Sequence, residues 1–238
     1  MRSTIFETIN LKKKFGNFYA LNGVNMKVMH GDVHAFLGPN GAGKSTTLRC
    51  LAGIIRATSG EVKILNHDAW RDAVNLHSRT AYVPGDVNLW DNLTGGEVID
   101  LFLSLHGKKV TESKRKKYLD RFELDPTKKC RTYSKGNRQK IALIAAFLSD
   151  AEFFILDEPT SGLDPLLEKV FQDCIGEVKA EGKTVLLSSH IMSEVEKLAD
   201  SVSIIKEGRI VLDGSMDEIL QKGKTLEELF LSEYKGGN

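Results

Sequence analysis

The run from Gly38 to Ser45, GPNGAGKS, matches the pattern G-x-x-x-x-G-K-[ST] and constrains the fold more than any other feature of this chain. It follows the apolar run Val33–Leu37 and precedes a helix predicted from about Lys44 to Ile55. A strand, a glycine-rich loop and a helix start in this order direct backbone N–H groups at a phosphate chain. The pattern predicts a nucleotide site, in which Lys44 neutralises the β- and γ-phosphates and the Ser45 hydroxyl binds Mg²⁺. We assign nucleotide binding to Gly38, Pro39, Asn40, Gly41, Ala42, Gly43, Lys44, Ser45 and Thr46.

The hydrophobic pattern changes its period twice along the chain. Strands are predicted at 4–11, 24–28, 33–37 and 61–65, and helices at 96–105, 112–122 and 136–148. Later strands are expected at 152–156, 184–188, 201–205 and 208–212, with helices at 165–180, at 191–198 and after Thr225. Alternating strands and helices imply parallel strands. The expected fold class is α/β: a P-loop NTPase core with a mostly parallel sheet, an N-terminal antiparallel β part and an inserted helical subdomain. We expect one domain over 1–238, in which 1–85 and 150–238 form the core and 86–149 form the insertion.

Charge is balanced overall but not locally. The 238 residues carry 33 Lys and Arg against 32 Asp and Glu, which argues against nucleic-acid binding through net charge. Residues 107–140 hold thirteen Lys or Arg and four Asp or Glu, a balance of +9 that leaves −8 for the rest. This stretch fits a solvated helix face and a surface beside anionic lipid headgroups about equally. RNA binding is a third option, with only two tyrosines among the charges.

Other composition signals narrow the class of protein. No apolar run approaches the ~20 residues of a membrane-spanning helix. The first seven residues contain no apolar signal core and carry an acid early. Cys50, Cys130 and Cys174 form no C-x-x-C pair, so reduced thiols in a cytosolic protein are expected rather than a disulfide framework.

A second motif is the apolar strand 153–156, which ends in two adjacent carboxylates, Asp157 and Glu158. Buried carboxylates are unfavourable unless something compensates them, and a magnesium ion beside phosphates does so. Adjacent residues leaving a strand point in different directions. Asp157 can therefore face the metal while Glu158 faces a water in line with the γ-phosphate. The alternative, that both acids simply begin a loop, is disfavoured by the phosphate loop upstream.

With these motifs the chain resembles the nucleotide-binding subunit of ABC transporters, and the resemblance covers nearly all of it. Residues 133–137, YSKGN, stand in the position of that family's L-S-G-G-Q signature, and Asp164 ends a segment that matches its D-loop. His190 matches the switch histidine, and Phe15 the aromatic that stacks on adenine. The resemblance implies that Glu158, His190 and Lys44 act in catalysis. It also implies that the signature contacts the ATP of a partner subunit, through Ser134, Lys135, Gly136 and Asn137.

Ordinary structural roles remain open for several of these residues. Phe15 also fits a core aromatic, and His190 a satisfied structural histidine. Ser134 and Gly136 also fit a plain helix cap, a geometry that can itself receive a phosphate.

Two departures from the family pattern stand out. Lys135 and Asn137 replace a glycine and a glutamine of the signature. Gly85 stands where the family has the glutamine of its Q-loop, which touches Mg²⁺ and senses the transmembrane partner. Asp86 is the nearest substitute and is a candidate metal ligand beside Ser45 and Asp157.

The resemblance implies an ATPase subunit that binds ATP and Mg²⁺ and drives a separate integral-membrane permease. Two ATP-binding subunits, as a homodimer or a heterodimer, are expected to close head to tail around ATP, with no nucleic-acid partner. The signature and the segment 226–230 look like the subfamily paired with ABC-2-type permeases, often exporters. We expect a cytoplasmic protein, peripheral on the inner face of the plasma membrane. The alternatives are a soluble non-transport ABC ATPase that acts on ribosomes or nucleic acid, and a module that holds ATP without turnover.

Overall fold

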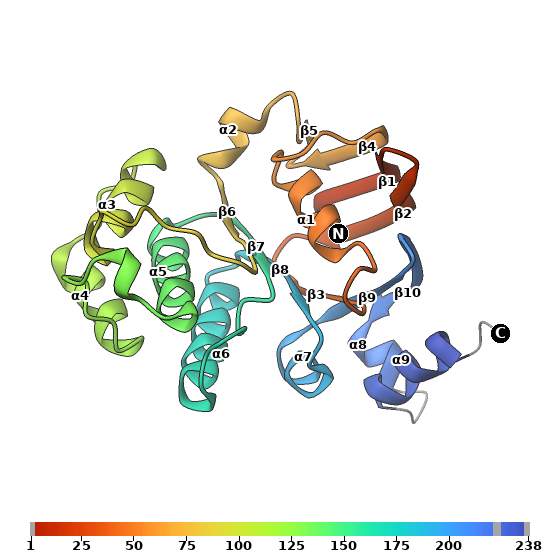
Figure 1. The fold of residues 1–238 in the computed structure, drawn as a ribbon. Helices are drawn as coiled ribbons and strands as arrows, with labels where there is room; N and C mark the ends of the chain where they lie inside the picture. Colours follow the sequence, from red (N-terminus) through yellow and green to blue (C-terminus); the bar gives the residue numbers. More distant parts are fainter. Residues whose placement is uncertain (1–2, 221–224, 236–238) are drawn as a thin grey trace.

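The computed structural model describes residues 3–220 and 225–235. A six-stranded sheet with the order β10-β9-β3-β8-β7-β6 runs through the centre (Figure 1). Its strands are β3 (Val33–Leu37), β6 (Thr80–Val83), β7 (Phe153–Asp157), β8 (Thr184–Ser189), β9 (Ser201–Lys206) and β10 (Arg209–Ser215). Neighbouring strands are parallel except for the antiparallel edge pair β9–β10. The expected α/β class with a mostly parallel sheet is confirmed.

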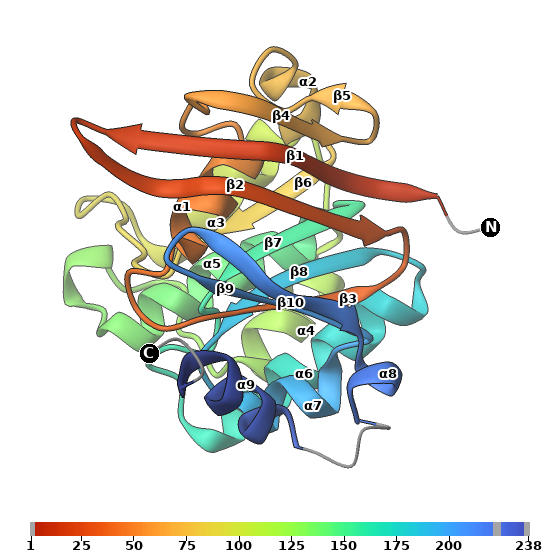
Figure 2. The same ribbon diagram turned by 90° about the vertical axis from the view of Figure 1, so that its right-hand side faces the viewer.

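A second sheet is antiparallel and has the order β2-β1-β4-β5. Its strands are β1 (Thr4–Phe15), β2 (Phe18–Met29), β4 (Ser59–Ile64) and β5 (His67–Asp68). Figure 2 shows this sheet above the six-stranded one. The expected N-terminal antiparallel part is thus present, with a longer hairpin than the sequence predicted.

Helices pack against the sheet faces that are not covered by the other sheet. They are α1 (Lys44–Leu51), α2 (Ala73–His77), α3 (Gly95–Leu105), α4 (Glu112–Arg121), α5 (Lys135–Leu148), α6 (Pro165–Ala180), α7 (Met192–Leu198), α8 (Met216–Leu220) and α9 (Leu226–Lys235), with a 3₁₀ turn at Cys130–Thr132. In Figure 1, α3, α4 and α5 form a group on the side away from the antiparallel sheet. Among the described residues, no helix combines the length and the apolar character needed to cross a bilayer.

Two hydrophobic cores meet at the six-stranded sheet, because successive residues of a strand point to opposite faces. Phe36 of β3 and Ile155 of β7 pack with Leu48 of α1 and with β1, β2 and β4. Their neighbours, among them Leu37 and Phe154, pack with α3, α4, α5 and α6 on the other face. Burying a side chain such as Phe36 fully contributes about 1.5–3 kcal/mol. This double burial fixes the strand ends that carry the site.

The division into a core and an insertion at residues 86–149 stays a prediction. The hydrophobic cluster that contains α3, α4 and α5 is continuous with the sheet, since Ala81 and Val83 of β6 belong to it together with Ile141 and Ala145 of α5.

Helix α1 ends at Leu51, four residues before the predicted end. Gly53 adopts φ +65°, and a side chain there would lie 2.6 Å from the Ala69 carbonyl oxygen. The N–H of Gly53 bonds to Cys50 and that of Ile54 to Arg49, which closes the helix as a left-handed glycine commonly does. The sequence also missed α2, α8, β5 and β6. The caps predicted at Thr111 and Thr225 are confirmed, because Thr111 accepts from the N–H of Lys114 and Thr225 from that of Glu228.

Candidate active site

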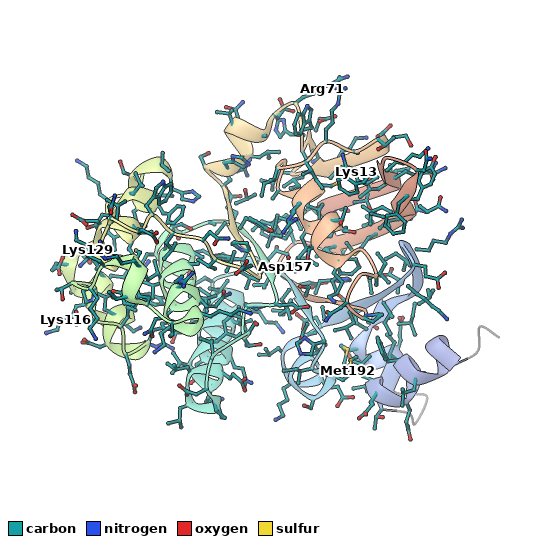
Figure 3. The ribbon with its side chains drawn as sticks, viewed as in Figure 1. Lys13, Arg71, Lys116, Lys129, Asp157 and Met192 are labelled. Carbon is teal, nitrogen blue, oxygen red and sulfur yellow. The ribbon has the colours of Figure 1, made fainter. Side chains whose placement is uncertain are left out.

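The loop between β3 and α1 forms the floor of an open cleft of about 330 Å³. The cleft is lined by Phe15, Phe18, Ala20, Pro39, Asn40, Gly41, Gly43, Lys44, Ser45, Thr46 and Glu158. Figure 3 places Asp157 where the helical group and the two sheets meet. The structure thus gathers Phe15, the phosphate loop and Glu158, which lie far apart in the sequence, around one space.

Gly43 shows why the loop needs a glycine before the helix. It caps α1 with φ 113°, and a Cβ atom there would lie 2.8 Å from Leu21 Cδ2 and 2.9 Å from the Ala20 carbonyl oxygen. The first turn of α1 holds no acid, and the first N–H groups of any helix lack partners within it. This helix start therefore presents N–H donors and partial positive charge to the cleft, as phosphate binding requires.

Lys44 is held at the centre of this loop. Its side chain is buried, and Nζ donates hydrogen bonds to the carbonyl oxygens of Gly38 (2.7 Å) and Pro39 (3.3 Å). Nζ also lies 3.4 Å from Oε1 of Glu158. The ammonium group is therefore placed by three oxygen contacts at the point where the motif expects the outer phosphates.

Asp157 and Glu158 share a partner that sequence reasoning missed. The hydroxyl of Ser188, at the end of β8, donates to Oδ1 of Asp157 (2.7 Å) and accepts from the N–H of Glu158 (2.9 Å). Asp157 is buried, whereas Glu158 has φ +47° and a side chain that is 27% exposed. The two acids leave the strand in different directions, as expected. The contact follows from the parallel register that pairs Asp157 with Ser188, which the sequence alone does not give.

His190 follows β8 and lies beside Glu158, with Nδ1 3.7 Å from Oε2. Its side chain is 60% exposed, so it is no buried structural histidine. Asp164 caps α6, where Oδ1 accepts from the N–H groups of Leu166 (3.0 Å) and Leu167 (3.1 Å).

The donors for a magnesium ion fit an ATP-bound metal better than a resident one. Within 3–220 and 225–235, no group of three His, Cys, Asp or Glu side chains could hold a metal. Ser45 lines the cleft, and Asp157 offers the carboxylate oxygen that Ser188 leaves free. Mg²⁺ prefers oxygen ligands, keeps several waters and takes the rest of its shell from substrate phosphates. Two protein oxygens are therefore sufficient.

Gly85 lies against Asp157. A Cβ atom at Gly85 would lie 3.1 Å from the carbonyl oxygen of Asp157 and 3.7 Å from its Cγ. Asp86 is exposed in the loop that follows. The loop residue that lies beside Asp157 is therefore Gly85, which has no side chain to bind a metal. A metal contact from Asp86 stays a prediction.

The four signature residues do not line the cleft of their own chain. Ser134 caps α5, and its Oγ accepts from the N–H of Asn137 (3.3 Å). Lys135 Nζ donates to Oγ of Ser161 (3.0 Å). A Cβ atom at Gly136 would lie 2.3 Å from the Gly162 carbonyl oxygen, so only glycine fits this contact. The start of α5 therefore packs on the segment 161–164.

Comparison with known proteins identifies the family of this chain. The sequence profile described as "ABC transporter" matches residues 21–161, which is more than half of the chain. The lantibiotic transport ATP-binding protein SrtF of Streptococcus pyogenes is 37% identical over 93% of this chain and 93% of that protein. The chain belongs to the ABC transporter family.

Other relatives place it among the ATP-binding subunits of this family. The daunorubicin resistance ATP-binding protein DrrA3 of Streptomyces coeruleorubidus is 34% identical over 92% of this chain and 71% of that protein. A solved structure described as the ATP-binding subunit of an ABC transporter superposes with a TM-score of 0.88 at 30% identity, over 97% of this chain and 99% of that one. A profile described as an AAA domain matches a shorter segment, residues 129–196. The chain is an ABC transporter ATPase subunit that binds ATP, and a soluble ABC ATPase acting on ribosomes is not favoured.

Two cleft residues of this ABC subunit were not predicted from its sequence. Phe18 stands opposite Phe15 in the β1–β2 register and is 66% exposed, and Ala20 lies near the phosphate loop. The signal in the sequence was the pair of aromatic residues Phe15 and Phe18 on either side of the turn residues Gly16 and Asn17.

Proposed function

We propose that this subunit hydrolyses MgATP to drive export of a peptide or drug-like compound through a separate ABC-2-type permease at the inner face of the plasma membrane. The names of its relatives support this class of cargo, because they refer to daunorubicin resistance, lantibiotic transport and bacitracin transport. The observation that carries the ATPase step is the cluster of Lys44, Glu158 and His190 at one edge of the cleft.

Each residue of the site has a separate role in ATP hydrolysis. The N–H groups of the phosphate loop and Lys44 Nζ bind the phosphate chain, and Phe15 stacks on adenine. Ser45 and Asp157 would hold Mg²⁺, which would supply positive charge beside the phosphates. Glu158 accepts a proton from the attacking water as a general base, and His190 contacts the γ-phosphate. Ser188 keeps Asp157 and Glu158 in their separate orientations through its two hydrogen bonds.

A second ATP-binding subunit completes the site in this proposal. The start of α5 has a serine cap and no acid in its first turn, and its signature residues are not among those that line the cleft of their own chain. It is a second anion-binding helix start that faces outward. Packing it against the γ-phosphate of a partner makes closure depend on ATP, and hydrolysis removes that link, which gives a two-state switch.

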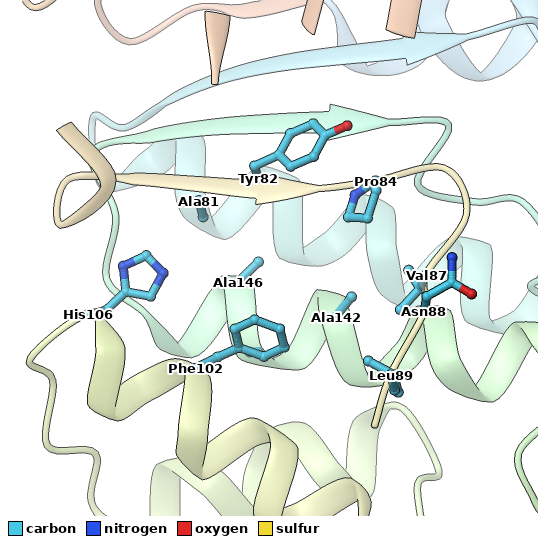
Figure 4. Close-up of a pocket in the computed structure, with 11 residues that line it drawn as sticks. Ala81, Tyr82, Pro84, Val87, Asn88, Leu89, Phe102, His106, Ala142 and Ala146 are labelled. Carbon is cyan, nitrogen blue, oxygen red and sulfur yellow. The ribbon is translucent and has the colours of Figure 1, made fainter. Parts of the chain in front are cut away.

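An apolar groove supports a docking site for the permease. It lies between β6, α3 and α5 (Figure 4) and is lined by Ala81, Tyr82, Pro84, Val87, Asn88, Leu89, Phe102, His106, Ala142, Ala145 and Ala146. A neighbouring pocket shares Phe102 and His106 and extends to Ile54 and Leu105, which are 49% and 73% exposed. Contiguous exposed apolar surface of this kind marks interaction sites.

The groove also lies close to the proposed site of ATP hydrolysis. Pro84 and Val87 line it, and Gly85 between them lies against Asp157. A permease segment seated in the groove would therefore press on the loop beside the metal-binding carboxylate, which offers a short physical link between transport and hydrolysis.

Purification of the tagged chain from native membranes tests this function. We expect one integral-membrane permease to copurify, and the complex in vesicles to move a labelled peptide or drug-like compound only with ATP. The same complex carrying Glu158→Gln should not transport. Copurification with ribosomes and no membrane protein would favour the soluble alternative instead.

A further inference from the structure

Lys13 makes two contacts that join the edge of the cleft to the end of α1. Its Nζ lies 4.9 Å from the centroid of the Phe15 ring. The same nitrogen donates a 2.8 Å hydrogen bond to the carbonyl oxygen of Arg56, in the loop that follows α1. Residues 13 and 15 share a face of β1, because side chains alternate along a strand.

The ring that Lys13 contacts is half exposed. Phe15 is 51% exposed and lines the cleft, whereas Lys13 is half-buried. An aromatic side chain this exposed has few packing contacts to fix its rotamer. An ammonium group within about 6 Å of a ring centroid is attracted to the ring face and holds it in place. The hydrogen bond to Arg56 in turn restricts where the ammonium can lie.

We propose that Lys13 is a positioning residue for adenine recognition. It covers one face of Phe15 and leaves the opposite face for the adenine ring. The inference rests on the proposed stacking role of Phe15. Because Arg56 lies in the loop that leaves α1, Lys13 also sets the aromatic ring relative to the helix whose N-terminus binds the phosphates. The adenine site and the phosphate site are thereby held at a fixed position relative to each other.

The neighbouring residue supplies a matched control. Lys14 lies on the same strand with Nζ 5.3 Å from the ring centroid of Tyr19, and Tyr19 does not line the cleft. Lys14→Met therefore removes the same charge and a similar ring contact without touching Phe15.

Binding of MgADP and of inorganic pyrophosphate by the full chain tests the proposal without turnover. A cation–π contact at a partly exposed site corresponds to about a two- to fivefold change in affinity. We expect Lys13→Met to weaken MgADP by this factor and to leave pyrophosphate unchanged. Lys13→Arg should restore MgADP binding, because a guanidinium also stacks on rings and donates hydrogen bonds. Lys14→Met should bind both ligands like the wild type.

A double-mutant cycle with Phe15→Ala completes the test, since residues in contact show non-additive effects. Lys13→Met should have no further effect on MgADP in the Phe15→Ala background. An equal loss in both backgrounds, an equal loss for pyrophosphate, or no loss at all would overturn the role of Lys13. If Phe15→Ala alone binds MgADP normally, the stacking role in the proposed function fails as well, which separates the two ideas.

Discussion

Lys44 and Glu158 face each other across the cleft, with Nζ of the lysine 3.4 Å from Oε1 of the acid. The lysine is tied to two carbonyl oxygens of the phosphate loop, and the acid is flanked by His190. This ion pair joins the loop after β3 to the end of β7, which is where the proposed function places the γ-phosphate and its attacking water.

The first prediction concerns Glu158→Gln. Glutamine keeps the shape and can still hydrogen-bond Lys44, but it cannot accept a proton from water. We expect MgATP to bind and to accumulate an ATP-bound dimer, while turnover falls about 10²–10⁴-fold, the usual contribution of a general base. Steady-state phosphate release and size-exclusion chromatography with ATP measure the two effects.

Glu168→Gln is the control for this variant, because Glu168 lies in the first turn of α6 and lines the same neighbouring pocket as Glu158 and His190, so the variant removes a nearby carboxylate charge without replacing Glu158. It should hydrolyse ATP normally. Turnover of Glu158→Gln within a few-fold of the wild type would remove Glu158 from the role of base.

The second prediction concerns the basic surface of α4. Arg115 is unsuitable for charge reversal, because it pairs with Asp100 at 3.1 Å and is only 18% exposed. Lys114 and Lys116 are exposed, and Figure 3 shows Lys116 at the outer edge of the helical group. Reversing both to Glu should weaken assembly with the permease and spare ATP affinity, if this face lies near anionic headgroups.

The control is a second protein in which Lys27 and Arg71 are replaced by Glu. Its net charge changes by the same amount, but on the side of the molecule that carries the antiparallel sheet. Pull-down of the permease should be reduced only by the α4 pair. Equal recovery with all three proteins would favour a merely solvated helix face.

The third prediction concerns acid stability and His34. The buried imidazole bonds to Ser201 through Nδ1 (2.7 Å) and to Ser203 through Nε2 (2.8 Å). Ser203 donates to the carboxylate of Asp213, so it accepts from Nε2–H, and His34 is neutral with Nδ1 as acceptor. Burial lowers the pKa of His34 to about 3, from 6.5.

The unfolded chain therefore binds a proton between pH 6.5 and 3 that the folded chain does not. Stability due to this group is complete above pH 6.5 and is lost as the pH falls toward 3. From pH 6 to pH 5 the wild type should lose about 1 kcal/mol more than His34→Gln, which cannot titrate. Urea unfolding of both proteins at the two pH values measures the difference. Parallel losses would show that His34 does not contribute.

The phosphate loop and the acid pair could be predicted because their signals are local. A glycine-rich turn between a buried run and a helix leaves little choice of backbone, and Asp157 and Glu158 follow their strand directly. The end of α1 was also readable, since Gly53 is a typical helix stop that the prediction passed over.

Contacts between distant segments could not be predicted in this way. The bonds from Ser188 to Asp157 and Glu158 depend on the parallel register of β7 and β8, about thirty residues apart. The apolar groove needs β6, α3 and α5 to be placed first, and the antiparallel hairpin hides its length because several positions near its tip are exposed aromatics and lysines.

The last prediction concerns the loop that lacks the family's glutamine. Gly85 has no side chain, yet a Cβ there would lie 3.1 Å from the Asp157 carbonyl oxygen. A contact this short requires the neighbour to shift by a few tenths of an ångström. Gly85→Gln should therefore fold, and should place an amide beside the Asp157 carboxylate, the proposed metal ligand. Because Mg²⁺ readily substitutes water for one neutral ligand, wild-type MgATP binding should already be normal.

Substitutions at Gly85 and at Asp86 are expected to have different effects on the ATPase activity of the assembled transporter. Gly85→Gln acts beside Asp157, so it should change the stimulation of ATPase activity by the permease several-fold. Asp86 is exposed, and only a movement on closure would bring it to the metal. Asp86→Ala should then lower stimulated turnover and spare basal turnover. If basal and stimulated turnover of Asp86→Ala both match the wild type, Asp86 is an ordinary loop acid, and coupling passes through the Gly85 backbone, which connects the apolar groove to Asp157.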